Sequence, residues 1–144
     1  MNRMCIEALE LAEKSYPKKK LQHAIRVANY AVEIAELDTR CGTQPQLNTD
    51  YVFTVAILHD LVEDTLVSQF MIDEQFDEYV SDAVTLLSKP EDVDYTDYIA
   101  HILDSDDLLA FWVKKADMKD HIAQTETLTD KLKEKYLPVL HKFM

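Results

Sequence analysis

Apolar residues recur every three to four positions along most of the chain, which is the spacing of one face of an α-helix. In the segment 21–41, Ile25, Ala28, Val32 and Ala35 follow this spacing. The segment 52–58 is apolar or small at almost every position, so it predicts a helix that is buried on most sides. We expect helices over 5–15, 21–41, from 50 through the stretch 56–65, over 68–76, 77–87, 95–103, from 106 to 125, and from 127 to the C-terminus.

Composition supports the same fold class. The 144 residues include one Gly and four Pro, so few tight hairpin turns can form. This length suits one core and leaves no room for a second domain. The sequence therefore predicts an all-α, compact single-domain helical bundle of about seven helices, covering residues 1–144.

The formal net charge of −12 excludes some partners. Such a chain repels nucleic acid and anionic lipid on average, and no apolar stretch is long enough to span a membrane. Cys5 and Cys41 form neither a metal-type pair nor a disulfide framework. We expect a cytoplasmic protein that binds no nucleic acid and no membrane, and that needs a local basic patch for any anionic substrate.

The stretch AILHDLVEDT, residues 56–65, places four ionisable groups in an otherwise apolar helical segment. The spacing of His59, Asp60, Glu63 and Asp64 puts all four along one wall of a helix. Buried carboxylates need a compensating partner, which would be a metal, a cluster of Lys and Arg, or open water. A solvated helix end, with a hydrogen-bonded core histidine, is the simpler alternative.

Two further segments carry similar side chains. His23 lies early in the second predicted helix, and Asp117 lies inside an amphipathic one. Lys114, Asp117 and His121 share a face through i, i+3 and i+7 spacing. Taken singly, His23 fits a surface position and Asp117 an exposed ion pair, which contributes little stability.

Together these residues read H…HD…D, and the sequence resembles the HD superfamily of metal-dependent phosphohydrolases. Within it, the chain is most similar to the hydrolase domain of RelA/SpoT homologues and to small alarmone hydrolases. The matching segments are HDLVEDT at 59–65 for H-D-x-x-E-D-T, KKAD at 114–117 for K-x-A-D, and HAIRVA at 23–28 for H-x-x-x-V-A.

The resemblance implies functional roles. The ligands of one divalent metal, Mn²⁺ in the family, would be His23, His59, Asp60 and Asp117; this nitrogen and oxygen set also suits Fe²⁺, Co²⁺ or Zn²⁺. The implied substrate is the alarmone (p)ppGpp, a small-molecule nucleotide from which the family releases pyrophosphate at the 3′ side. Glu63 and Asp64 would act in general acid/base catalysis. Candidate substrate-binding residues are Arg26, Lys114, His121, Lys18, Lys19 and Lys20.

Several positions depart from the family pattern. The G-x-P-Y segment before the first histidine is absent, and Ala24 replaces the proline after His23. Met118 and His121 stand where the family has a basic residue and an asparagine. These departures keep two alternatives open: an HD nucleotidase or phosphodiesterase acting on another nucleotide, and a catalytically silent nucleotide-binding domain.

Overall fold

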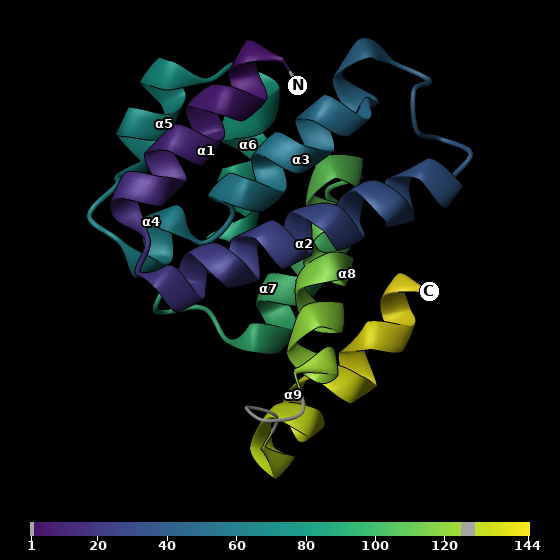
Figure 1. Cartoon of the computed structure of the whole chain (residues 1–144). Helices are drawn as coiled ribbons and strands as arrows, with labels where there is room; N and C mark the ends of the chain where they lie inside the picture. Colours follow the sequence, from purple (N-terminus) through teal and green to yellow (C-terminus); the bar gives the residue numbers. More distant parts are fainter. Residues whose placement is uncertain (1, 125–128) are drawn as a thin grey trace.

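The computed structural model describes residues 2–124 and 129–144, and within these ranges the chain is helical with no strand (Figure 1). The predicted all-α fold is therefore confirmed. The elements are α1 (Arg3–Ser15), α2 (Lys18–Leu37), a 3₁₀ turn (Pro45–Leu47), α3 (Thr49–Leu58), α4 (Leu61–Asp64), α5 (Gln69–Gln75), α6 (Glu78–Leu87), α7 (Tyr95–Asp104), α8 (Leu108–Ala123), α9 (Asp130–Leu140) and a 3₁₀ turn (His141–Phe143).

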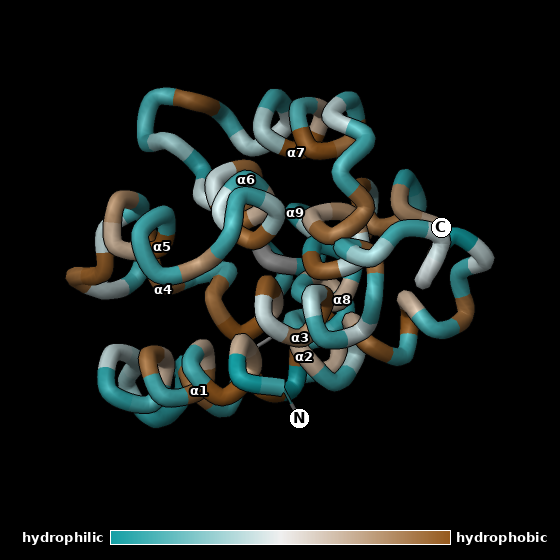
Figure 2. The backbone as a smooth tube through the Cα atoms, turned by 90° about the horizontal axis from the view of Figure 1, so that it is seen from above, coloured by the Kyte–Doolittle hydropathy of each residue, from teal (hydrophilic) through white to brown (hydrophobic). Residues whose placement is uncertain are grey.

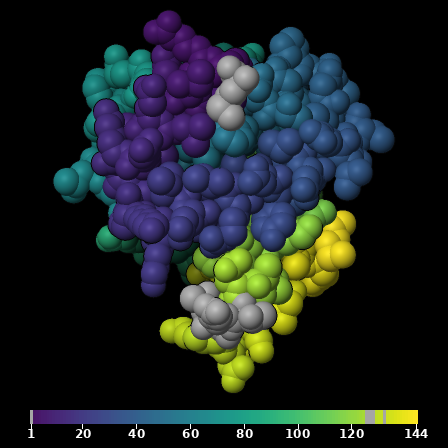
Figure 3. All heavy atoms as spheres, in the orientation of Figure 1, coloured from purple at the N-terminus to yellow at the C-terminus, as the bar shows by residue number. Residues whose placement is uncertain are grey.

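Helix α2 crosses the middle of the molecule and packs against both α3 and α8. Helix α1 packs on α3, α6 lies against α3 and α8, and α9 covers α8. Seen from above, α1 and α7 lie along opposite edges with α3 and α6 between them (Figure 2). The space-filling view shows α2 as a band across one face, with α8 and α9 below it (Figure 3).

The face of α2 that meets α3 and α8 is built from small side chains. Ala24, Ala28, Ala31 and Ala35 are all fully buried. Small residues let helix axes approach closely, and the same face carries His23 one turn inside the helix start. The packing of α2 thus decides how near His23 comes to side chains on the other two helices.

The predicted boundaries of α2 are wrong at both ends. The helix starts at Lys18, so the three lysines form its first turn, and it ends at Leu37 well before Gly42. The chain leaves the helix at Asp38, whose Oδ2 accepts a hydrogen bond of 2.9 Å from the indole Nε1 of Trp112 on α8. This tertiary contact ends the helix; Gly42 instead occupies a turn with φ of 79°.

The predicted continuous helix through 56–65 is also wrong, because α3 stops at Leu58 and the short helix α4 follows. The hydroxyl of Tyr16, a buried residue after α1, lies in the gap. It donates to the carbonyl of Ile57 at 3.1 Å and accepts from the N–H of Asp60 at 3.1 Å. A side chain inserted into the backbone hydrogen-bond ladder breaks a helix, and here the break falls at His59 and Asp60.

Other predicted helix starts hold to within a few residues. Asn48 and Ser68 cap α3 and α5 by accepting hydrogen bonds from backbone N–H groups three residues ahead. Asp107 caps α8, one residue after the predicted start at 106. The predicted helix end at 125 and the predicted helix start at 127 lie outside the described residues, and Pro138 lies inside α9.

None of the helices in the described ranges has the length and apolar character needed to cross a bilayer.

We predict that Tyr16→Phe destabilises the protein by about 1–3 kcal/mol, because it leaves a buried carbonyl of Ile57 and a buried N–H of Asp60 without partners. The free energy of unfolding from urea titration measures this. Tyr79→Phe, at a 44% exposed tyrosine, is the matched control and should change stability by less than about 0.5 kcal/mol. Equal effects of the two variants would contradict the proposed role of the Tyr16 hydroxyl.

Candidate metal centre

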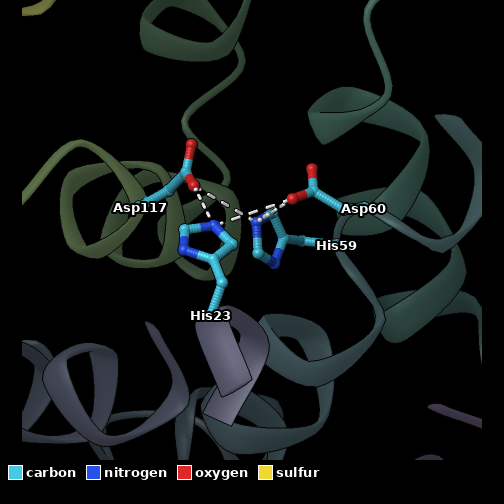
Figure 4. Close-up of side chains that lie close together, drawn as sticks. All are labelled: His23, His59, Asp60 and Asp117. Atoms are coloured by element: carbon cyan, nitrogen blue, oxygen red, sulfur yellow. Dashed lines mark hydrogen bonds and ion pairs between the residues drawn. The ribbon is translucent and has the colours of Figure 1, made fainter. Parts of the chain in front are cut away.

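Four side chains from three parts of the fold converge at one point (Figure 4). His23 comes from α2, His59 and Asp60 from the α3–α4 break, and Asp117 from α8. One donor atom of each lies within 4.8 Å of those of the others. The Nε2 atom of His59 is 3.1 Å from Oδ2 of Asp60 and 3.4 Å from Oδ1 of Asp117.

The ring of His59 has a fixed orientation and proton position. Its Nδ1 is 2.5 Å from the carbonyl of Ala56, which can only accept, so Nδ1 carries a proton. In the neutral ring the lone pair is then on Nε2, which points into the cluster. This Nε2 is buried and has no hydrogen-bond partner among the described residues.

The two oxygens of Asp117 have separate roles. Oδ2 accepts a hydrogen bond of 3.0 Å from the ammonium of Lys114, one turn earlier on α8. Oδ1 faces the imidazoles and lies 2.9 Å from Nε2 of His23. Lys114 is itself buried, with its Nζ 5.2 Å from the ring centroid of Tyr98. One oxygen of the carboxylate is thus neutralised and the other stays available to a ligand.

Charges in the cluster shift the pKa values of its members. Burial opposes protonation of His59. The negative charge of Asp60, and the contacts that His59 makes with Asp60 and Asp117, outweigh this effect and hold the pKa of His59 well above its ordinary value. For Asp117, burial is outweighed by the charge of Lys114 and by the histidine contacts, so its pKa lies well below the ordinary range. Without another cation, protons on the imidazoles balance the carboxylates.

These residues fit a divalent metal. Two imidazole nitrogens and two carboxylate oxygens are a donor set typical of first-row divalent ions. Donors on one ion, each at about 2.1 Å, lie up to about 4.2 Å apart, so the observed cluster is close to this requirement. The buried Nε2 of His59 points into the cluster, where such an ion would replace the proton that this nitrogen otherwise holds.

The cluster lies at one side of a pocket of about 220 Å³. Although the chain carries a net charge of −12, four lysines line this pocket: Lys20, Lys89, Lys114 and Lys135. Tyr95, Tyr98 and Tyr136 line it too. Cations gathered beside a cluster of acidic residues suggest a site that accepts an anion bound next to a metal.

Glu63 and Asp64 both line this pocket, one turn beyond Asp60. Oε1 of Glu63 accepts a hydrogen bond from the backbone N–H of Lys89. Partial burial raises the pKa of Glu63; that N–H opposes the shift, and the charges of Asp60 and Asp64 add to it. Asp64 is paired with Lys20, whose Nζ lies 3.0 Å from Oδ2.

The predicted substrate-binding residues divide into two groups. Lys114, Lys20 and His121 line the pocket, and the ring of His121 stacks on Tyr136 with centroids 4.9 Å apart. Among the residues that the structure describes, Lys18 and Lys19 are exposed and do not line it. Arg26 does not line it either, because its guanidinium forms an ion pair with Asp120.

Sequence reasoning missed other residues of this region. Asp120 lies three residues after Asp117 and Arg26 three after His23, so matched i, i+3 spacing on two helices was an available signal. Lys135 comes from α9, whose return to the site left no local pattern. Lys89 follows α6 in a segment that the sequence indicated only as a helix end.

A model of the HD domain family matches residues 21–132, a span that contains His23, the His59–Asp60 pair and Asp117. The chain belongs to the HD domain family. This membership confirms the predicted class, a metal-dependent phosphohydrolase. A search among curated proteins gave no match.

A solved structure of another protein has a similar fold. It is described as a metazoan orthologue of SpoT that hydrolyses ppGpp and plays a role in starvation responses. It is 18% identical in sequence, with a TM-score of 0.72, and the match covers 99% of this chain and 84% of that one. The likeness confirms the HD-type fold over the whole chain.

We predict that a divalent metal at 100 times its Kd stabilises the wild-type protein by about 2.7 kcal/mol, and that Asp60→Asn loses most of this gain because it removes one ligand oxygen charge. Thermal unfolding with and without Mn²⁺ or Zn²⁺ measures it. Asp64→Asn, one turn away in the same pocket, is the control and should keep the metal-induced stabilisation. The same gain in Asp60→Asn as in the wild type would exclude Asp60 as a ligand.

Proposed function

We propose that this HD domain protein hydrolyses (p)ppGpp, or a close relative of it, and releases pyrophosphate from the 3′ side. The observation that carries the proposal is the position of four lysines around a pocket that is also lined by three members of the two-His, two-Asp cluster. A substrate with several phosphate charges fits such a pocket in an otherwise acidic chain. The fold shared with an enzyme described as hydrolysing ppGpp supports the same choice.

In this proposal His23, His59, Asp60 and Asp117 bind one divalent ion, with Mn²⁺ as the metal that the family resemblance favours. The ion, when bound, would polarise a phosphoryl oxygen and make a water molecule more acidic. Lys114 is placed to keep Oδ2 of Asp117 neutralised, so that only Oδ1 faces the ion. The buried Nδ1 hydrogen bond of His59 keeps its other nitrogen directed at the same point.

Glu63 and Asp64 are the proposed acid/base pair. Neither is among the four clustered ligands, and both face the pocket. The raised pKa of Glu63 brings this carboxyl closer to neutral pH, where a group exchanges protons most efficiently. The Lys89 N–H fixes the orientation of the Glu63 carboxylate, and the Lys20 ammonium fixes that of Asp64.

The pocket size indicates which part of the substrate enters. At about 220 Å³ it is smaller than the 300–1,000 Å³ of typical small-molecule sites. We infer that the 3′ phosphates enter and that the nucleoside lies outside. Partial burial and the nearby charge of Lys114 lower the pKa of Lys135, as expected for an ammonium group that lies near a second cation. An anion bound between the two would relieve this repulsion.

A second candidate is an HD nucleotidase or phosphodiesterase that acts on a different nucleotide. Met118 is fully buried, so it cannot replace the family's basic residue as a substrate contact. His121 stacks on Tyr136, which gives this wall a different chemistry from the family's asparagine. A panel of nucleotides assayed in parallel for orthophosphate and pyrophosphate separates the two candidates, since only the first predicts pyrophosphate. Binding without turnover of any compound would favour the silent domain.

We further propose that residues 1–144 act as one hydrolase domain in the cytoplasm. Cys5 and Cys41 are both free thiols, as in proteins of a reducing compartment.

We predict pyrophosphate release from ppGpp with Mn²⁺ and none after chelation. Glu63→Gln should lower kcat by about 10²–10⁴-fold, because the amide cannot exchange a proton, while the metal-induced stabilisation is kept. Glu91→Gln, at an exposed acid in the loop after α6, is the matched control with unchanged kcat. Alarmone that stays intact with each of several divalent metals would refute this substrate.

We also predict that Lys135→Ala lowers kcat/KM for ppGpp by about 10- to 100-fold, the effect of losing one hydrogen bond to a charged group. Lys133→Ala, which removes an exposed lysine two residues earlier on α9, should leave kcat/KM unchanged. Steady-state kinetics of both variants measure the difference. If the two variants behave alike, the pocket-lining position of Lys135 has no role in substrate binding.

A further inference from the structure

Asp120 is a fully buried carboxylate on α8 that faces α2. Its Oδ2 lies 2.7 Å from Nδ1 of His23. Both of its oxygens accept from Arg26: Oδ1 from Nε at 2.9 Å and Oδ2 from Nη2 at 3.2 Å. Asp120 lines neither the pocket nor the solvent-exposed surface, so it can act only through His23 and Arg26.

These contacts determine which nitrogen carries the proton when the ring of His23 is neutral, as it must be to bind a metal. A carboxylate that binds a guanidinium through both oxygens accepts hydrogen bonds and does not donate them. Nδ1 of His23 must then be the donor. The other ring nitrogen, Nε2, faces Oδ1 of Asp117 at 2.9 Å and Oδ2 of Asp60 at 3.7 Å, inside the cluster.

Arg26 allows Asp120 to accept the hydrogen bond from His23 without adding net charge to the region of the cluster. The guanidinium binds the carboxylate with two parallel hydrogen bonds, a rigid arrangement that lysine cannot reproduce. Its side chain is 38% exposed, so its positive charge keeps contact with water while the carboxylate is buried. The pair is neutral overall, whereas an unpaired Asp120 would add a third negative charge beside Asp60 and Asp117.

We propose that Asp120, held by Arg26, is a positioning residue for the metal centre: it fixes the ring orientation and tautomer of His23, so that Nε2 is the ligand atom. The inference rests on the proposed function, since it requires a metal at the cluster. Arg26, which the sequence indicated as a substrate contact, is assigned here to this pair. Partners of this kind typically change metal affinity by about 10- to 100-fold.

Asp120→Asn tests the proposal because an amide cannot serve both neighbours. If its oxygen accepts from Arg26, its NH₂ group faces Nδ1 of His23 and favours the wrong tautomer. We expect the Zn²⁺ affinity, measured by competition with a chromogenic chelator, to fall by about 10- to 100-fold. Zn²⁺ is used because its high affinity keeps weakened variants measurable.

A double-mutant cycle separates positioning from a general structural effect. In a His23→Gln background, Asp120→Asn should have almost no further effect on Zn²⁺ affinity, because it acts through the imidazole. Asp38→Asn is the matched control: Asp38 also binds an arginine side chain, that of Arg40, through both oxygens but lies away from the cluster. It should leave the affinity unchanged. If Asp120→Asn fails to fold, Arg26→Gln replaces it in the cycle, with a loss of affinity expected in the same direction.

The outcomes are distinct. An equal loss of affinity with and without His23 would overturn the positioning role while leaving the metal centre intact. A wild-type protein that binds no Zn²⁺ and no Mn²⁺ would overturn the proposed function together with this inference. A loss of Zn²⁺ affinity that Asp120→Asn causes only when His23 is present supports the positioning role.

Discussion

The structure depends on one electrostatic constraint: two carboxylates and two imidazoles meet where three helical segments pack together, largely out of solvent. Buried carboxylates are costly unless positive charge or hydrogen-bond donors compensate them. Lys114 supplies one compensating charge from within α8. The remaining negative charge faces a small pocket lined by lysines, and this is where a divalent metal of the kind used by the HD family would bind.

Three of the four side chains are held in place by a contact on the side away from the cluster, and the fourth, that of Asp60, is positioned through its backbone. Tyr16 breaks the α3–α4 segment so that His59 and Asp60 both face the cluster. The carbonyl of Ala56 orients His59. Lys114 orients Asp117, and Asp120 orients His23. Because these contacts come from different helices, correct packing of α1, α2, α3 and α8 is a condition for the site, and the small residues of α2 make that packing possible.

Much of this arrangement could be predicted from the sequence, but the features that depend on long-range contacts could not. The 3.6-residue pattern gave the helices, and the HDLVEDT and KKAD segments indicated which ionisable residues share a face. The break at His59 was not predictable, because its cause is the hydroxyl of Tyr16, more than 40 residues away in sequence. The end of α2 likewise depends on a long-range contact between Asp38 and Trp112. Lys135 reaches the pocket only through the return of α9. The resemblance to the HD family therefore indicated the clustered residues, while the partners that orient them required the tertiary structure.

We propose that His23 and His59 bind one metal ion together with Asp60 and Asp117. Pulsed electron paramagnetic resonance of the protein loaded with one equivalent of Mn²⁺ tests it most directly, because nitrogen atoms bound to the ion give resolved couplings. Two coordinated imidazole nitrogens are expected, with one of them lost in His23→Gln. A spectrum without nitrogen coupling, or one unchanged by that substitution, would contradict the account.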